Sequence, residues 1–157
     1  MRGLLSVVLL GLMAQMAQAA PRRGYVAAGV GIPELVHAEA GWFVAPRVSL
    51  EVHGGFPILS PLAGVGVTGW LLGQAEGGPP RHSLTVSGRA RVNVLYPLMI
   101  RSKGERLGPV LEPLLGYGLV TDGGFLLRVD VGALVYLDEH HGLAGGPQGL
   151  VTLGYAF

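Results

Sequence analysis

The chain has 157 residues and a formal net charge of +1, and 13% of its residues are charged while 50% are hydrophobic. A typical soluble domain has about 25% charged residues, so this composition argues against an ordinary soluble protein. The absence of cysteine excludes a disulfide framework and a lipoprotein attachment site. The sequence also contains no phosphate loop, dinucleotide fingerprint or nucleic-acid-binding patch.

The N-terminus has the three parts of an export signal. Arg2 provides a positive start, Leu4–Met13 an apolar stretch, and Ala17–Ala19 an A-x-A cleavage motif. The apolar stretch is shorter than the roughly 20 residues that a membrane-spanning helix needs. We therefore expect a cleavable helical signal peptide at residues 1–19 and one mature domain at residues 20–157. The alternative is an uncleaved amphipathic anchor.

Eight strand-like segments follow, separated by Gly, Pro, Asn, Asp and Ser. Most are close to the 9–11 residues with which a tilted strand crosses the hydrocarbon core of a membrane. No internal repeat or linker divides them. The expected strands are Gly24–Ile32, Leu35–Val44, Arg47–Phe56, Leu62–Gly73, His82–Tyr96, Val110–Val120, Phe125–Leu137 and Gly149–Phe157.

Side chains in these segments alternate between two faces with the period of a β-strand. In Phe125–Leu137, for example, Val129 and Val131 fall on one face and Arg128 and Asp130 on the other. The apolar face of all eight segments lacks Asp, Glu, Lys and Arg. The opposite face is expected to carry a structural network of four acids and four arginines, whose charges can cancel: Glu39, Arg47, Glu51, Arg89, Arg91, Glu112, Arg128 and Asp130.

This pattern predicts an all-β fold, a closed eight-stranded antiparallel up-and-down transmembrane β-barrel. In lipid only helices and closed barrels satisfy all their backbone groups, and an arginine facing lipid at mid-depth costs about 2–4 kcal/mol. A soluble lipocalin-like protein would show the same alternation with the apolar face inward. Aromatic residues near the strand ends of the apolar face are typical of membrane-interface girdles: Trp42, Phe56, Tyr96, Phe125, Tyr155 and Phe157.

The last segment resembles the C-terminal strand of bacterial outer-membrane proteins, which commonly end in Phe after alternating apolar residues. Here the alternating residues are Val151, Leu153, Tyr155 and Phe157, and Thr152 departs from the Gly of many such signals. With the export signal and eight strands, the chain is similar to small Gram-negative barrels of the outer-membrane protein A and X type. The resemblance implies recognition by the barrel-assembly machinery and contact with outer-membrane lipid and lipopolysaccharide.

The same resemblance implies that both termini lie on the periplasmic side. The expected outer loops are then Pro33–Glu34, Pro57–Pro61, Pro97–Pro109 and Asp138–Pro147. Pro113 lies inside an expected strand of a barrel without edges, so we expect a bulge or another irregularity there.

Catalytic chemistry is not expected. Ser49, Glu51 and His53 share one face, but side chains two apart on a strand start about 6.5–7 Å from each other, so no triad forms within it. The His-x-Ser motif of barrel lipid A deacylases is absent. Asp138–His141 contains metal-ligand residue types without preorganised geometry, and no metal or cofactor is expected. The basic residues of the loop 97–109 could contact lipopolysaccharide phosphates, although a solvated loop is favoured.

The expected role is structural, adhesive or envelope-maintaining. The alternatives are a lipid A-modifying enzyme, a narrow porin-like channel, or a soluble secreted lipocalin-like protein. A lumen plugged by ion pairs argues against the channel.

Overall fold

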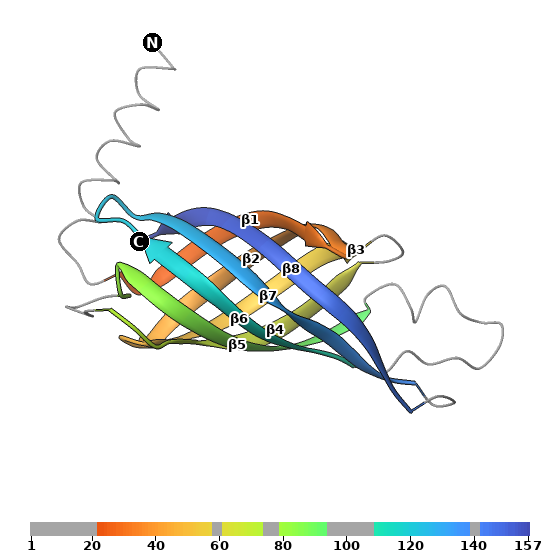
Figure 1. Ribbon diagram of the computed structural model, residues 1–157. Coiled ribbons are helices and arrows are strands. Elements are labelled where there is room, and N and C mark those ends of the chain that lie inside the picture. The colour runs from red at the N-terminus through yellow and green to blue at the C-terminus, as the bar shows by residue number, and fades with distance from the viewer. Residues whose placement is uncertain (1–21, 58–60, 74–78, 94–108, 139–141) are drawn as a thin grey trace, which may run out of the picture.

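The computed structural model describes residues 22–57, 61–73, 79–93, 109–138 and 142–157, and these form one closed antiparallel barrel of eight strands (Figure 1). Each strand pairs with its neighbours in sequence, and β8 closes the barrel on β1. The predicted signal peptide lies outside the described residues. The strands are β1 (Gly24–Ile32), β2 (Glu34–Ala45), β3 (Val48–Pro57), β4 (Leu62–Trp70), β5 (His82–Asn93), β6 (Val110–Val120), β7 (Phe125–Asp138) and β8 (Gly142–Ala156).

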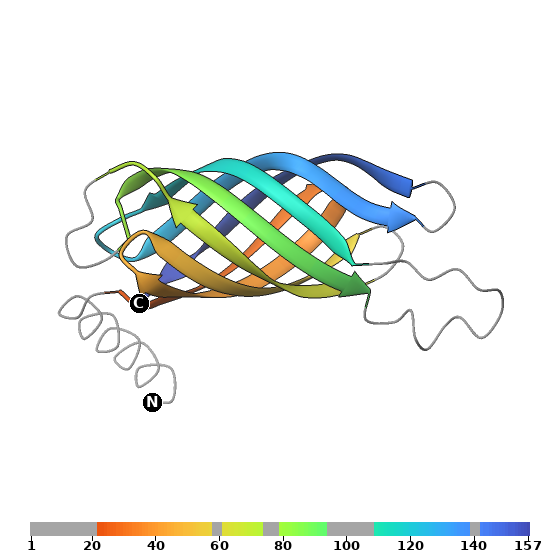
Figure 2. The ribbon, with the colours of Figure 1, turned by 90° about the horizontal axis from the view of Figure 1, so that it is seen from below.

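The size of the barrel follows from its register. We followed the cross-strand partners once around the barrel, starting at Val110 of β6. The path passes through Arg91, Glu39 and Leu126 and returns to β6 at Val120, ten residues further along the chain. Such a stagger requires strands tilted by about 35–45°, and eight strands leave an interior just wide enough for side chains. The strands accordingly run obliquely around the barrel (Figure 2).

All eight predicted strands are confirmed, and their bounds differ mainly at one place. β8 begins seven residues before the predicted Gly149, and Gly142–Gln148 pairs with β7 (Figure 1). This glycine-rich segment indicates a loop by composition, but the β7 backbone supplies a complete ladder for it. Along a strand, the backbone nitrogens of successive residues point alternately to the two neighbouring strands. Phe157 donates its N–H to Gly24 of β1, and Pro147 lies an even number of residues away, so its nitrogen also points toward β1. The β1–β8 ladder ends at Gly149, so Pro147 removes no ladder hydrogen bond.

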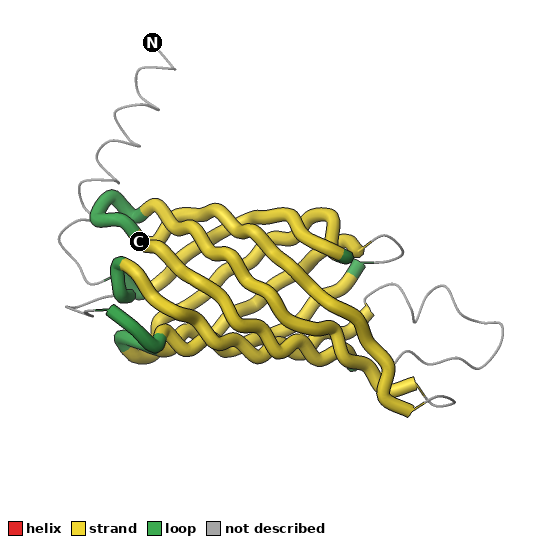
Figure 3. Tube along the Cα trace, viewed as in Figure 1, coloured by secondary structure: helices red, strands yellow, loops and turns green. Residues whose placement is uncertain are grey.

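The end of the barrel where β1 begins and β8 ends is called the terminal rim, and short turns join β2 to β3 and β6 to β7 there (Figure 3). β4 ends at Trp70 rather than at the predicted Gly73, which has a φ of 96°. Only glycine adopts this conformation readily, so the chain turns here. The predicted outer loop 97–109 and the end of the expected fifth strand, including Tyr96, lie outside the described residues, apart from Pro109.

The irregularity expected at Pro113 is present, without a bulge. The β6–β7 ladder omits the pairs of Glu112 and Pro113 and resumes at Leu114 in the same register. Val120 donates its N–H toward β5. Pro113 lies an odd number of residues away on the same strand, so its nitrogen points to the other side, toward β7. The missing donor therefore coincides with the gap in the ladder.

The predicted sorting of side chains is also confirmed, except at Arg47. Val131 is 59% exposed on the outer wall, whereas its neighbour Asp130 and also Arg128 are fully buried in the interior. Among the described residues no helix is long and apolar enough to span a membrane.

Candidate functional site

The interior at the terminal rim is apolar. Tyr25, Phe43 and Trp70 stack in series with ring centroids 5.7 and 5.6 Å apart. The buried cluster also contains Ala27, Val120, Leu126 and Ala156. All seven side chains come from strand segments next to the same rim, so they close this end of the barrel with hydrocarbon and aromatic surface.

Arg128 occupies the centre of the interior. Its guanidinium lies 2.9 Å from Glu39, 2.8 Å from Glu51 and 2.7 Å from Asp130, and all four side chains are fully buried. Arg89 adds a second cation, at 2.7 Å from Glu39 and 3.4 Å from Glu51. Five residues predicted from strand alternation are thus brought into one network, which crosses the barrel from β2 and β3 to β5 and β7.

Hydroxyl groups also coordinate one oxygen of Glu51. Its Oε1 accepts hydrogen bonds of 2.6 Å from Tyr25 and from Thr68, besides the one from Arg128. Ser87 lies 2.6 Å from the Thr68 hydroxyl and extends the network to β5. These bonds satisfy Oε1, whereas Oε2 has no hydrogen-bond partner among the described residues and lies 3.4 Å from Arg89.

A second cluster surrounds Arg91, nearer the opposite rim. Its guanidinium lies 2.6 Å from Glu34 and 2.9 Å from Glu112, and all three side chains are buried. Glu112 and Arg91 were predicted, whereas Glu34 was assigned to a connection. A register shift between Glu34 and Val36 turns the Glu34 side chain inward, because a bulge re-aims the residues that precede it. Simple alternation would have placed it outside.

Gly55 provides the space for Glu34. A Cβ on Gly55 would lie 1.4 Å from Glu34 Oε1. Only glycine fits this position while the carboxylate reaches Arg91.

The prediction for Arg47 is wrong. The chain turns at Pro46 and Arg47, and β3 begins at Val48. Arg47 therefore lies exposed at the terminal rim, where water solvates its charge, and it donates to the carbonyls of Leu71 and Gly73 at 3.1 and 2.9 Å.

These two changes alter the charge balance of the interior. The sequence predicted four acids and four arginines, but the described interior has five carboxylates and three guanidiniums. Uncompensated buried charge costs several kcal/mol, so a neutral interior holds two additional protons on these carboxylates or on the buried His37 and His53. The groups are Glu34, Glu39, Glu51, Glu112 and Asp130 with Arg89, Arg91 and Arg128.

Ser49, Glu51 and His53 are buried together but do not form a nucleophile–base pair. The Ser49 hydroxyl accepts a hydrogen bond from Trp70 Nε1 at 3.2 Å and lies 3.5 Å from Glu51. Neither ring nitrogen of His53 has a hydrogen-bond partner among the described residues. His37 instead pairs with Thr152, at 2.8 Å.

No group of three or more His, Cys, Asp and Glu side chains in the described part of the chain is arranged to hold a metal ion. The candidate segment Asp138–His141 lies largely outside that part, as do the basic residues of the loop 97–109. The residues of the proposed assembly signal all point outward from β8 or its end: Val151, Leu153, Tyr155 and Phe157.

Comparison with protein-family models, curated proteins and solved structures gave no match for this chain. The class of protein is therefore defined by its fold and interior alone. It is a closed eight-stranded antiparallel β-barrel that encloses a buried network of charged side chains.

Proposed function

We propose that this protein is an integral β-barrel of a Gram-negative outer membrane with a structural, adhesive or envelope-maintaining role. The distribution of polarity between the two faces carries the proposal. The outer wall presents large exposed hydrophobic residues on every strand, while the charged strand side chains face inward. In water this arrangement leaves apolar surface exposed around the whole barrel, whereas in a bilayer both faces are matched to their surroundings.

The interior supports a role without transport or catalysis. Side chains of Arg89, Arg128 and their acidic partners are fully buried across the middle of the barrel, and the aromatic cluster closes one end. Ser49 is engaged by Trp70 rather than by a histidine. We therefore propose neither a conducting pore nor an acyl-transfer enzyme. Planar-bilayer conductance and lipid A analysis after overexpression test these two statements.

The remaining expectations follow from the resemblance of the terminal strand. We propose that residues 1–19 are removed on export through the periplasm, that β8 is recognised by the barrel-assembly machinery, and that the outer wall contacts membrane lipid and lipopolysaccharide. The intact mass of protein recovered from the outer membrane tests the cleavage, because it should correspond to a chain that begins at Ala20.

A matched pair of substitutions separates the membrane barrel from a soluble one. Val131 and Leu71 are both exposed, on β7 and at the terminal rim respectively. In a membrane Val131→Arg should cost about 2–4 kcal/mol and Leu71→Arg at most about 1 kcal/mol, because the penalty falls toward the interface. In water both changes should be equally harmless.

The readout is membrane fractionation followed by gel mobility with and without boiling. We expect a heat-modifiable band in the outer membrane that is weakened by Val131→Arg and kept by Leu71→Arg. A soluble periplasmic protein without a mobility shift, unaffected by either change, contradicts the proposal.

A further inference from the structure

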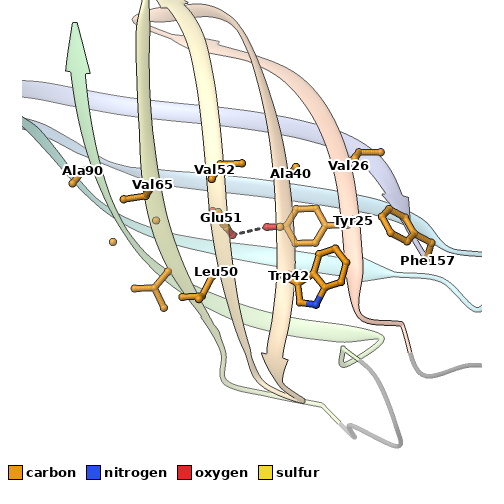
Figure 4. Close-up of a pocket in the computed structure, with 14 residues that line it drawn as sticks. Tyr25, Val26, Ala40, Trp42, Leu50, Glu51, Val52, Val65, Ala90 and Phe157 are labelled. Atoms are coloured by element: carbon orange, nitrogen blue, oxygen red, sulfur yellow. Dashed lines mark hydrogen bonds between the residues drawn. The ribbon is translucent and has the colours of Figure 1, made fainter. Parts of the chain in front are cut away.

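The outer wall contains a groove of about 870 Å³ across β1 to β5. Small side chains form its floor, where Ala40, Val52, Val65 and Ala90 are successive cross-strand partners (Figure 4). The next cross-strand partner in this row, Leu111 on β6, is bulkier and exposed. The groove is open on its outer side and its lining is almost wholly apolar, so it can accept an apolar chain that lies along the wall.

Two aromatic rings bound the groove toward the terminal rim. Trp42 and Phe157 both line it, and Trp42 is 57% exposed. A Cβ on Gly24 would lie 3.0 Å from the Phe157 ring and 3.4 Å from the Trp42 ring, so the two rings converge over this glycine. Aromatic side chains of this kind favour the boundary between hydrocarbon and polar headgroups.

Positive charge lies at the same rim as these rings. The backbone N–H of Arg23 donates to the carbonyl of Phe157, and Arg47 follows β2 three residues after Val44. Both arginines are exposed. The described residues of the terminal rim carry four arginines and one acid, so this set is net positive: Arg22, Arg23, Arg47, Arg81 and Asp122.

We propose that this groove binds an anionic glycerophospholipid of the periplasm-facing leaflet. The acyl chains lie along the small-residue floor. The phosphate accepts hydrogen bonds from Arg23 and from the N–H groups of Arg47 that its bonds to Leu71 and Gly73 leave free. Charge complementarity selects this occupant, because arginine donors suit a phosphate and each basic residue near an anionic membrane surface contributes about 1 kcal/mol. The inference rests on the proposed membrane location, with the termini on the periplasmic side.

The two tryptophans of the chain allow a direct test. Trp42 borders the groove, whereas Trp70 is fully buried in the interior. Bilayers that contain phosphatidylglycerol or phosphatidylcholine with brominated acyl chains quench a tryptophan that the chains touch. The signal of a Trp42→Phe variant gives the Trp70 background, and its subtraction leaves the quenching of Trp42. We expect brominated phosphatidylglycerol to quench Trp42 at lower lipid fractions than brominated phosphatidylcholine. The relative affinity for phosphatidylglycerol should be roughly fivefold higher for each arginine that participates.

Matched variants assign the preference to the groove. Arg23→Gln and Arg47→Gln should each reduce it, while Arg81→Gln removes a charge from the same rim, where it pairs with Asp122, and should leave it unchanged. Filling the floor with Ala40→Leu should lower the quenching, whereas Ala133→Leu on the outward face of β7 should not.

Three results overturn the inference in distinguishable ways. Equal quenching of Trp42 by both lipids, in a barrel that remains heat-modifiable, rejects the lipid site and leaves the proposed function intact. Protection of Trp42 from every lipid, with a dimer in native mass spectrometry, assigns the groove to a second copy of the chain. Absence of quenching in a monomer that does not insert rejects the proposed function as well.

Discussion

The central arginine provides the most demanding test of the buried network. Arg128→Met keeps an unbranched apolar side chain in the space but removes the cation that contacts Glu39, Glu51 and Asp130. Removal of one partner from a buried ion pair costs roughly 3–5 kcal/mol, because the other charge stays buried without compensation. Native domains are stable by only about 5–15 kcal/mol, so this single change should remove a large part of the stability.

The assay is equilibrium urea unfolding in detergent or vesicles, followed by tryptophan fluorescence and by the heat-modifiable gel shift. Arg81→Met is the control, because the Arg81–Asp122 pair is exposed at the rim and exposed pairs contribute about 0–1 kcal/mol. Adding Glu51→Gln to Arg128→Met should recover part of the loss, since it removes one of the carboxylates left without the guanidinium.

If Arg128→Met costs no more than Arg81→Met, the buried ion pairs do not stabilise the barrel. If Glu51→Gln lowers the stability of the Arg128→Met barrel further, the loss does not come from unpaired negative charge.

Two further predictions concern the packing and charge of the interior. Gly55→Ala should lower the free energy of unfolding by about 1–3 kcal/mol, because the added methyl group collides with Glu34. Gly146→Ala is the control in the same urea titration, because a methyl group there meets nothing within 4 Å. An equal effect of the two substitutions would show that the collision does not lower the stability. Glu112→Gln should change stability by less than about 1 kcal/mol because it relieves excess negative charge, whereas Glu51→Gln should cost roughly 1.5–3 kcal/mol because Glu51 accepts charge-assisted bonds. If Glu112→Gln and Glu51→Gln lower the stability equally, the interior does not carry excess negative charge at Glu112.

The sequence was sufficient to predict the barrel because the strand period is two. Asp130 cannot face the same way as Val131, so once one side chain is assigned inward its whole strand follows. This rule located Arg89, Arg91 and Arg128 in the interior without any knowledge of register. It could not pair them with particular acids, because partners across the barrel depend on the stagger of ten residues.

The errors arose where local geometry departs from the strict period. A register shift turns Glu34 inward, and a turn at Pro46 places Arg47 at the rim. Neither is visible in composition, since both residues adjoin a proline that is compatible with turn or strand. The start of β8 was missed because Gly142–Gln148 has little side-chain signal, and its pairing depends on the β7 backbone.

The unequal lengths of β8 and β1 also influence how copies of the chain can associate. Among the described residues, the segment Gly142–Gln148 of β8 pairs only with β7, and an unpaired strand edge is a template for the strand of another molecule. Pro147 presents its ring nitrogen to that edge in place of a donor, so an incoming strand finds an interrupted row of N–H groups. A proline at this position therefore disfavours edge-to-edge pairing between copies of the chain.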